Sequence, residues 1–201
     1  IGSLGSIVAA WHRIRNGHEP IASNPESTYA ENFLHMLGAE NITPLMTRIM
    51  DATLVLHGEH TINASTFTAM VTSSTLANAS QVMASAIGSL SGPLHGGANE
   101  KVVSMLEKID SKEDIRPWLD ETLKAKNVVW GMGHREYSVK DPRANILTDM
   151  VQELFKEREG GVTDIFEKAI ELEKACEEKL AHKGVYPNVD FYSGILYKEM
   201  G

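Results

Sequence analysis

One histidine stands between a proline and a pair of glycines in SGPLHGGANEKV, residues 91–102. Pro93 stiffens the backbone before His95. Gly96 and Gly97 allow conformations that larger residues disfavour, which indicates a turn at the start of a helix. The positive end of that helix favours a neutral imidazole, which can donate a hydrogen bond to an oxygen that becomes negative during a reaction. Capping of the turn is the other interpretation of His95.

A second histidine and an arginine lie in GMGHREYSVKDPRA, residues 131–144. His134 follows a Gly-x-Gly turn, and Arg143 stands at the predicted start of a helix. A guanidinium group suits a carboxylate, and a histidine N–H can polarise a carbonyl, so this pair favours an oxo-acid. The Gly-x-Gly alone is weak evidence for phosphate binding, because no Walker A or complete dinucleotide motif accompanies it.

A carboxylate follows a proline turn in YPNVDFYSG, residues 186–194. Asp190 has the apolar residues Val189 and Phe191 on either side. It can cap a helix, or it can act as a general base whose pKa is raised by partial burial. Two histidine donors, an arginine and a base together supply the parts for removing a proton next to a carbonyl group.

The segment HGEH, residues 57–60, raises the question of a metal site. His57 and His60 are three residues apart with Glu59 between them, which is not the His-Glu-x-x-His spacing of zinc enzymes. Because no third ligand cluster accompanies them, we expect no metal.

Helical patterns surround these segments and predict an all-α fold. One helix is predicted to end near Gly17, and the next to run from Thr28, which has capping-box spacing to Glu31, as far as Gly38. Thr43 with Pro44 predicts a third start. Four amphipathic helices are predicted later in the chain, over residues 99–109, 112–125, 142–159 and 163–184. The last of them has Thr163 as its N-cap and Gly184 beyond its end. Only residues 124–134 could pair as a short strand.

Small side chains dominate residues 64–91, where Ala, Ser and Thr are interleaved with apolar residues such as Phe67 and Val71. A disordered or strand-rich segment is the alternative, but the apolar residues favour a buried helix at a subunit interface, where small side chains let backbones approach closely.

The composition bounds the class of protein. With 201 residues, 42% of them hydrophobic, the chain can bury a core and form one or two domains. A net charge of -8 argues against nucleic-acid or membrane-surface binding. Cys176 is the single cysteine, so no intrachain disulfide is available, and it is expected to pack along a helix. No signal sequence or membrane-spanning run of about 18 apolar residues is present, and we expect a cytoplasmic location.

Four motifs, in this order, resemble the citrate synthase family, and the resemblance extends over essentially the whole chain. They are H-x-x-H-x-x-N-x-S-T at residues 57–66, G-P-x-H-G-G-A-N at 92–99, G-x-G-H-R-x-Y at 131–137 with D-P-R at 141–143, and N-V-D-F-Y-S-G at 188–194.

This resemblance implies a role for each of five residues. Asp190 would remove a proton from the methyl group of acetyl-CoA while His95 hydrogen-bonds the thioester oxygen. The enol would attack oxaloacetate, whose ketone is polarised by His134 and whose carboxylates are held by Arg143 and His60. Hydrolysis of citryl-CoA would release citrate and CoA. By the same resemblance, CoA would be seated by Val129, Gly131, Met132 and Gly133, with acetyl-CoA as a substrate and no further cofactor.

The resemblance also implies an architecture. Residues 1–102 would form part of a large helical domain, residues 103–195 a small helical domain that closes over the substrates, and residues 196–201 a return towards the large domain. The family forms homodimers or larger assemblies, which would explain the composition of residues 64–91.

Departures from the family leave alternatives open. Arginines that bind substrate carboxylates after the last motif are absent, so we expect weak or no activity from these 201 residues alone. Glu136 replaces an apolar residue of many relatives, and nothing in the sequence explains it. One alternative is a 2-methylcitrate synthase using propionyl-CoA, because a hydrophobic pocket discriminates only modestly between substrates that differ by one methylene. Two others are a citryl-CoA lyase module and a non-catalytic dimerisation or regulatory module.

Overall fold

The computed structural model describes the chain except residues 1, 59–60, 93, 135–136 and 158–159. Within this part the protein is all-α, as predicted, with one isolated β-bridge. Contacts divide it into two compact units, Ile1–Glu59 with Met200–Gly201, and His60–Glu199. These units do not test the division at residues 102 and 195, which stays a prediction.

Three helices make up the first unit: α1 (Leu4–Arg15), α2 (Tyr29–Leu37) and α3 (Pro44–Leu56). Helix α2 packs against both α1 and α3. Its start is capped by Thr28, whose hydroxyl accepts a hydrogen bond from the Glu31 N–H, and its end is marked by Gly38 at a φ of 92°. Thr43 caps α3 in the same way. The predicted boundaries are therefore confirmed here.

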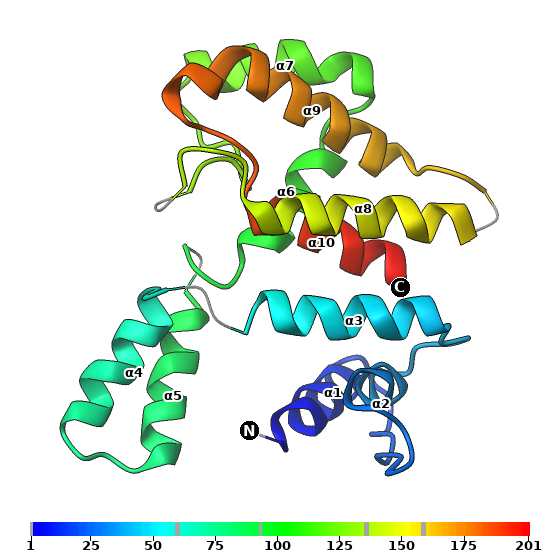
Figure 1. The fold of residues 1–201 in the computed structure, drawn as a ribbon, viewed down its shortest axis with the longest axis vertical. Helices are drawn as coiled ribbons and strands as arrows, with labels where there is room; N and C mark the ends of the chain where they lie inside the picture. Colours follow the sequence, from blue (N-terminus) through cyan, green and yellow to red (C-terminus); the bar gives the residue numbers. More distant parts are fainter. Residues whose placement is uncertain (1, 59–60, 93, 135–136, 158–159) are drawn as a thin grey trace. The chain divides into compact units, whose positions relative to one another are not determined.

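A helical hairpin opens the second unit, where α4 (Ala64–Ser74) packs antiparallel to α5 (Ala79–Leu90) (Figure 1). The prediction of one continuous helix over residues 64–91 is wrong, whereas its burial at a subunit interface stays a prediction. Leu76 has a φ of 61° and Asn78 begins a new capping box, so the helix is interrupted. Neither helix contains a buried residue, because each contacts chiefly the other.

Five further helices form the rest of the second unit: α6 (Ala98–Glu107), α7 (Ile115–Lys124), α8 (Pro142–Glu157), α9 (Asp164–Leu180) and α10 (Val189–Met200). Short 3-10 turns at Lys112–Asp114 and Ala181–Lys183 precede α7 and follow α9. Helix α9 contacts α6 and α7, and Figure 1 shows α7 and α9 lying alongside each other.

Aromatic side chains join three of these helices. Phe155 of α8 lies 5.2 Å, between ring centroids, from Phe166 of α9, which lies 6.3 Å from Tyr192 of α10. Phe191 and Tyr192 are fully buried. Such contacts add to the free energy gained from burying apolar surface. They fix α10, whose first turn carries Asp190, to the body of the unit.

The predicted N-cap role of Thr163 is half right. Thr163 occupies the N-cap position of α9, but its side chain makes no capping hydrogen bond. Its hydroxyl instead donates to Glu199 Oε1 in α10, at 2.6 Å. The hydroxyl therefore ties two helices together. Gly184, predicted beyond the end of α9, follows the 3-10 turn with a φ of 68°.

None of the helices in the described part of the chain is long and apolar enough to cross a lipid bilayer.

Candidate active site

Two segments far apart in sequence pair through their backbones and bring predicted site residues together. Gly133 N–H donates to Tyr186 O at 2.7 Å, and Asn188 N–H donates to Gly131 O at 2.9 Å, around an antiparallel bridge between Met132 and Pro187. The short pairing predicted within residues 124–134 is thus confirmed as a single bridge. It places the segment before His134 beside the segment that leads into α10.

Asn188 reinforces this pairing with both ends of its side chain. Its Oδ1 accepts a hydrogen bond from the Asp190 N–H at 3.0 Å, which caps the start of α10. Its Nδ2 donates to Gly133 O at 2.8 Å. Asp190 therefore lies in the first turn of α10, half-buried, and Asn188 takes the capping role.

His134 is oriented by the residues that follow it. Its Nδ1 accepts a hydrogen bond from the Tyr137 N–H at 3.2 Å, and the two rings lie 4.7 Å apart between centroids. In a neutral imidazole, an accepting Nδ1 leaves the proton on Nε2. The ring can therefore donate from Nε2. Glu136, which departs from the family pattern, lies outside the described residues.

Arg143, the second residue of α8, is held by the carboxylate of Asp141. The Arg143 Nη2 donates to Asp141 Oδ2 at 2.7 Å, and Nε donates to both carboxylate oxygens, at 3.1 and 3.2 Å. The Arg143 N–H also donates to Oδ1, at 2.9 Å. Asp141 in turn donates its N–H to Pro187 O at 3.2 Å, which joins the arginine segment to the paired backbones.

The charge of Asp141 is stabilised although the residue is fully buried. Burial by itself raises the pKa of its carboxyl group, but the hydrogen bonds and positive charge of Arg143 outweigh burial and hold that pKa below its ordinary value. Asp141 therefore stays ionised at neutral pH and fixes the direction of the Arg143 guanidinium.

His95 lies in the turn between α5 and α6. Its N–H donates to Gly92 O at 3.0 Å, and its Nε2 lies 2.7 Å from Ser65 Oγ in the first turn of α4. Asn63 caps α4 by accepting from the Thr66 N–H at 2.9 Å. The motif at residues 57–66 thus supplies both the cap and the hydroxyl partner of His95. Sequence reasoning did not assign this role to Ser65.

A close helix contact links the two ends of the candidate site. A Cβ on Gly194 of α10 would lie 2.5 Å from the backbone oxygen of Asn99 in α6, so only glycine permits this approach. Asn99 follows His95 by about one helical turn, and Gly194 follows Asp190 by the same interval. The structure therefore brings the helix after His95 against the helix that carries Asp190.

The residues expected to seat CoA lie in the paired segment. Val129 and Gly131 are buried, while Met132 and Gly133 are half-buried. Gly131 has a φ of 78° and lies so close to α10 that a Cβ would come within 2.8 Å of Phe191 Cδ2. Beside them, Lys101 Nζ lies 4.0 Å from the centroid of the Trp130 ring. Their role in CoA binding stays a prediction.

The HGEH segment is only partly described. His57 follows α3, and its Nδ1 lies 2.7 Å from Thr53 O, an interaction within that helix end. His60, predicted to hold a substrate carboxylate, lies outside the described residues. Among the residues that the structure does describe, no three His, Cys, Asp or Glu side chains gather as metal ligands.

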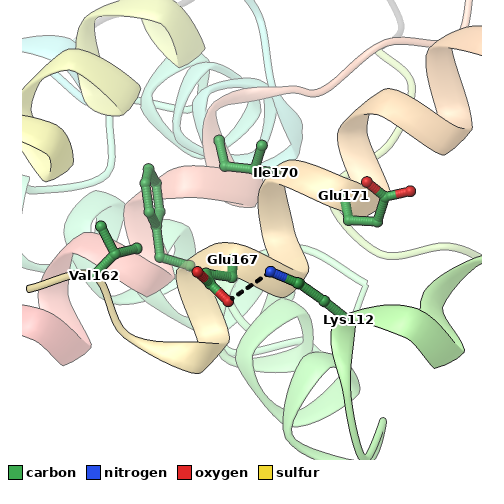
Figure 2. A pocket seen from close by; sticks show the side chains of 6 residues that line it. Lys112, Val162, Glu167, Ile170 and Glu171 are labelled. Atoms are coloured by element: carbon green, nitrogen blue, oxygen red, sulfur yellow. Dashed lines mark hydrogen bonds and ion pairs between the residues drawn. The ribbon is translucent and has the colours of Figure 1, made fainter.

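Two hollows in the second unit do not contain the predicted site residues. Figure 2 shows one of about 280 Å³ beside α9, where Lys112 Nζ pairs with Glu167 Oε2 at 3.3 Å. The other, of about 400 Å³, lies between α6 and α10 and includes Gly194 and Tyr197.

Sequence comparisons agree on one family. Residues 1–201 match the family described as citrate synthase, C-terminal domain. The chain is 50% identical over 200 residues to citrate synthase from Synechocystis sp., covering 100% of this chain and 50% of that protein. It is 48% identical over 201 residues to citrate synthase from Acidithiobacillus ferridurans, covering 100% and 52%. The chain thus spans about half the length of these curated relatives.

Solved structures give the same result. Citrate synthase from Pyrobaculum aerophilum has a TM-score of 0.90 at 34% identity, over 98% of this chain and 49% of that one. The ternary complex of citrate synthase from Thermoplasma acidophilum with carboxymethyl coenzyme A and oxaloacetate has a TM-score of 0.89 at 31% identity, over 98% and 52%. The chain belongs to the citrate synthase family, whose C-terminal domain it matches from residue 1 to residue 201.

Proposed function

We propose that the chain carries the residues that condense acetyl-CoA with oxaloacetate and water to give citrate and CoA, an acyltransferase reaction. The observation that carries this proposal is the backbone pairing of residues 131–133 with 186–188, joined by Asp141 through Pro187. It gathers a histidine donor, an oriented arginine and a carboxylate. The relatives named citrate synthase, and the oxaloacetate and CoA analogue bound by one of them, support the choice of substrates.

Each group has a chemical task in this proposal. Asp190 removes a proton from the acetyl methyl group, and His95 donates a hydrogen bond to the thioester oxygen as it becomes negative. The resulting enol attacks the ketone of oxaloacetate, which the Nε2–H of His134 polarises. Arg143, directed by Asp141, binds a substrate carboxylate together with His60. Water then cleaves citryl-CoA.

Binding of CoA is assigned to Val129, Gly131, Met132 and Gly133, with no resident metal or cofactor. Gly133 combines a positive φ with open space, since a Cβ there would lie 3.9 Å from its nearest neighbour, Val185 Cγ1, so a ligand can approach this backbone closely, whereas Gly131 packs against Phe191. The single cysteine of these residues fits a reducing compartment, and the proposal includes a location in the cytoplasm. Burial and the nearby charge of Glu173 raise the pKa of the Cys176 thiol to about 12, so it stays protonated at neutral pH.

The proposal includes a homodimer or larger assembly formed through α4 and α5. Phe67 is 61% exposed, Val71 51% and Leu76 95%, and Ile87 of α5 is also exposed. An apolar face of this extent is typical of a protein interface rather than of a solvated surface. The abundant Ala, Ser and Thr side chains permit the close approach of a second copy.

The decisive experiment measures release of the CoA thiol from the complete protein that contains this chain. Oxaloacetate is combined with acetyl-CoA or propionyl-CoA, and the wild type is compared with Asp190→Asn and with Asp149→Asn, an exposed carboxylate on α8. We expect oxaloacetate-dependent release from acetyl-CoA that is lost in Asp190→Asn and kept in Asp149→Asn.

The other outcomes separate the alternatives. Preference for propionyl-CoA would identify a 2-methylcitrate synthase. Absence of release with either thioester, from a folded protein, would refute the synthase proposal and favour a lyase or a regulatory module.

A further inference from the structure

Three side chains that the proposed reaction does not use form a partly buried cluster behind the candidate site. The Tyr192 hydroxyl of α10 donates to Glu173 Oε2 of α9. The other carboxylate oxygen of Glu173 forms an ion pair with Lys140, whose Nζ also lies 5.6 Å from the centroid of the Tyr192 ring. Glu173 is therefore the one member bonded to both of the others.

The cluster is shielded from water. The side chain of Lys140 is 27% exposed and that of Glu173 is 16% exposed, whereas Tyr192 is fully buried. Burial and the charge of Glu173 raise the pKa of Tyr192, which keeps its hydroxyl a hydrogen-bond donor. Loss of Glu173 would leave the Lys140 ammonium without its carboxylate and the Tyr192 hydroxyl with Thr148 as a remaining partner, so Lys140 and Tyr192 both depend on Glu173 for their position.

The positions of these residues in the chain connect the cluster to the candidate site. Lys140 directly precedes Asp141, which orients Arg143. Tyr192 lies two residues after Asp190 on α10. Glu173 belongs to neither segment, and it comes from the middle of α9.

We propose that Glu173 is a positioning residue that fixes the Arg143 segment and the Asp190 helix relative to each other. Through Lys140 it holds the segment that binds the oxo-acid, and through Tyr192 it holds the first turns of α10. The role rests on the proposed function, because it concerns how substrate-binding and proton-removing groups are aligned. Small displacements of aligned groups lower rates strongly.

The proposal predicts a division of kinetic effects in the complete protein. Lys140→Gln loosens chiefly the arginine segment, because Tyr192 keeps its hydrogen bond to Glu173, so it raises the KM for oxaloacetate more than it lowers kcat. Tyr192→Phe loosens only α10, so it lowers kcat. Glu173→Gln acts on both, and we expect each parameter to change by about tenfold. Glu177→Gln, an exposed carboxylate one turn further along α9, is the matched control and changes neither.

Amide hydrogen exchange gives a readout that does not require turnover. In Glu173→Gln, exchange is expected to accelerate in residues 138–144 and 188–193, which lie in different elements, and to stay unchanged in Glu177→Gln. A lower melting temperature with KM, kcat and exchange in both segments unchanged would make Glu173 merely structural and overturn the proposal.

The two proposals fail in different ways. An inactive wild type refutes the proposed condensation, and the exchange experiment then decides whether Glu173 joins the two segments. Normal wild-type turnover with a Glu173→Gln variant that alters only one kinetic parameter leaves the condensation standing and refutes the joint positioning role.

Discussion

Two side chains, one buried and one half-buried, position the groups that we propose to be reactive. Asp141 directs the Arg143 guanidinium through several hydrogen bonds, and Asn188 caps α10 while holding Gly133. Neither residue touches a substrate in the proposed mechanism. Both restrict the conformation of a neighbouring residue or segment that is proposed to bind substrate. Substitution of either is therefore expected to lower both stability and activity.

Asp141 makes the stability of the protein depend on pH. Because its pKa is lower in the folded than in the unfolded chain, its contribution is present above the ordinary value of about 4 and is lost as the pH falls through the lower folded value. Asp141→Asn should lose about 3 kcal/mol of unfolding free energy at neutral pH and flatten the acid dependence. Urea unfolding between acid and neutral pH measures this, and an unchanged acid dependence would contradict it.

Asn188 should matter more than an ordinary helix cap. Asn188→Ala removes the cap of α10 and the bond to Gly133, which costs about 2 kcal/mol and lowers kcat by about tenfold. Thr43→Ala removes only the cap of α3 and should cost about 1 kcal/mol with kcat intact. Denaturation curves and CoA-thiol release give both quantities. Equal kcat in the two variants would refute a positioning role for Asn188.

Sequence reasoning could propose reactive groups but not the residues that hold them. His95, His134, Arg143 and Asp190 stand out because their types beside glycines, prolines and helix starts are suited to chemistry. Asn188 looks like an ordinary turn residue, since its importance comes from a bond to the distant Gly133 O, and Asp141 shows no sign in sequence that its carboxylate binds the Arg143 side chain two residues later. The contact between the Ser65 hydroxyl and His95 joins residues that are 30 positions apart, so no local sequence pattern predicts it.

At the level of helices, α6 and α10 approach each other closely at Gly194. Gly194 leaves no room for a side chain against Asn99 O, whereas its neighbour Ser193 is buried with no hydrogen-bond partner for its hydroxyl in the described part of the chain. One position has no spare volume, and the other has an unsatisfied polar group. Substitution by alanine should therefore lower the unfolding free energy at Gly194 but not at its neighbour Ser193.

Gly194→Ala is expected to push α10 away from α6. A Cβ at 2.5 Å from a backbone oxygen cannot be relieved by rotating a flexible side chain, so the unfolding free energy should fall by about 2 kcal/mol. Ser193→Ala removes a hydroxyl that gains nothing from burial and should cost no stability. Thermal and urea unfolding of the two variants provide the comparison. Equal stabilities would show that α6 and α10 can separate without cost.

Helix boundaries could be predicted where capping residues mark them, as at Thr28, Gly38 and Thr43. The break between α4 and α5 was not. Leu76 adopts a left-handed conformation that its residue type disfavours, and its apolar character fitted a continuous helix. Thr163 illustrates another limit, because its hydroxyl bonds to Glu199 rather than to its own helix.

For the molecule as a whole, the α4–α5 hairpin is the feature on which the proposed assembly rests. Its apolar residues are exposed because, in the described part of the chain, each helix contacts chiefly the other. The all-α class followed from helical periodicity, but burial of these residues could not be judged from a single chain. Composition predicts that a surface will be covered without saying by which molecule.

Val71→Glu should weaken self-association by placing a charge in the proposed interface. Sedimentation velocity over a range of concentrations should show the wild type shifting to larger species and the variant remaining smaller. Val55→Glu, at an exposed position on α3, is the control and should sediment as the wild type does. A wild type that stays monomeric at every concentration would refute the interface.

The pairing of residues 131–133 with 186–188 also determines when the candidate site can form during folding. The hydrogen bond between Asn188 and Gly133 closes a loop of 55 residues. Closing so long a loop costs conformational entropy before the contact contributes any stability, which slows its formation. During synthesis on the ribosome, His134 and Arg143 emerge long before the strand-like partner that aligns them. The nascent chain therefore exposes the groups proposed to bind the oxo-acid before the proposed base, because Asn188 and Asp190 leave the exit tunnel later.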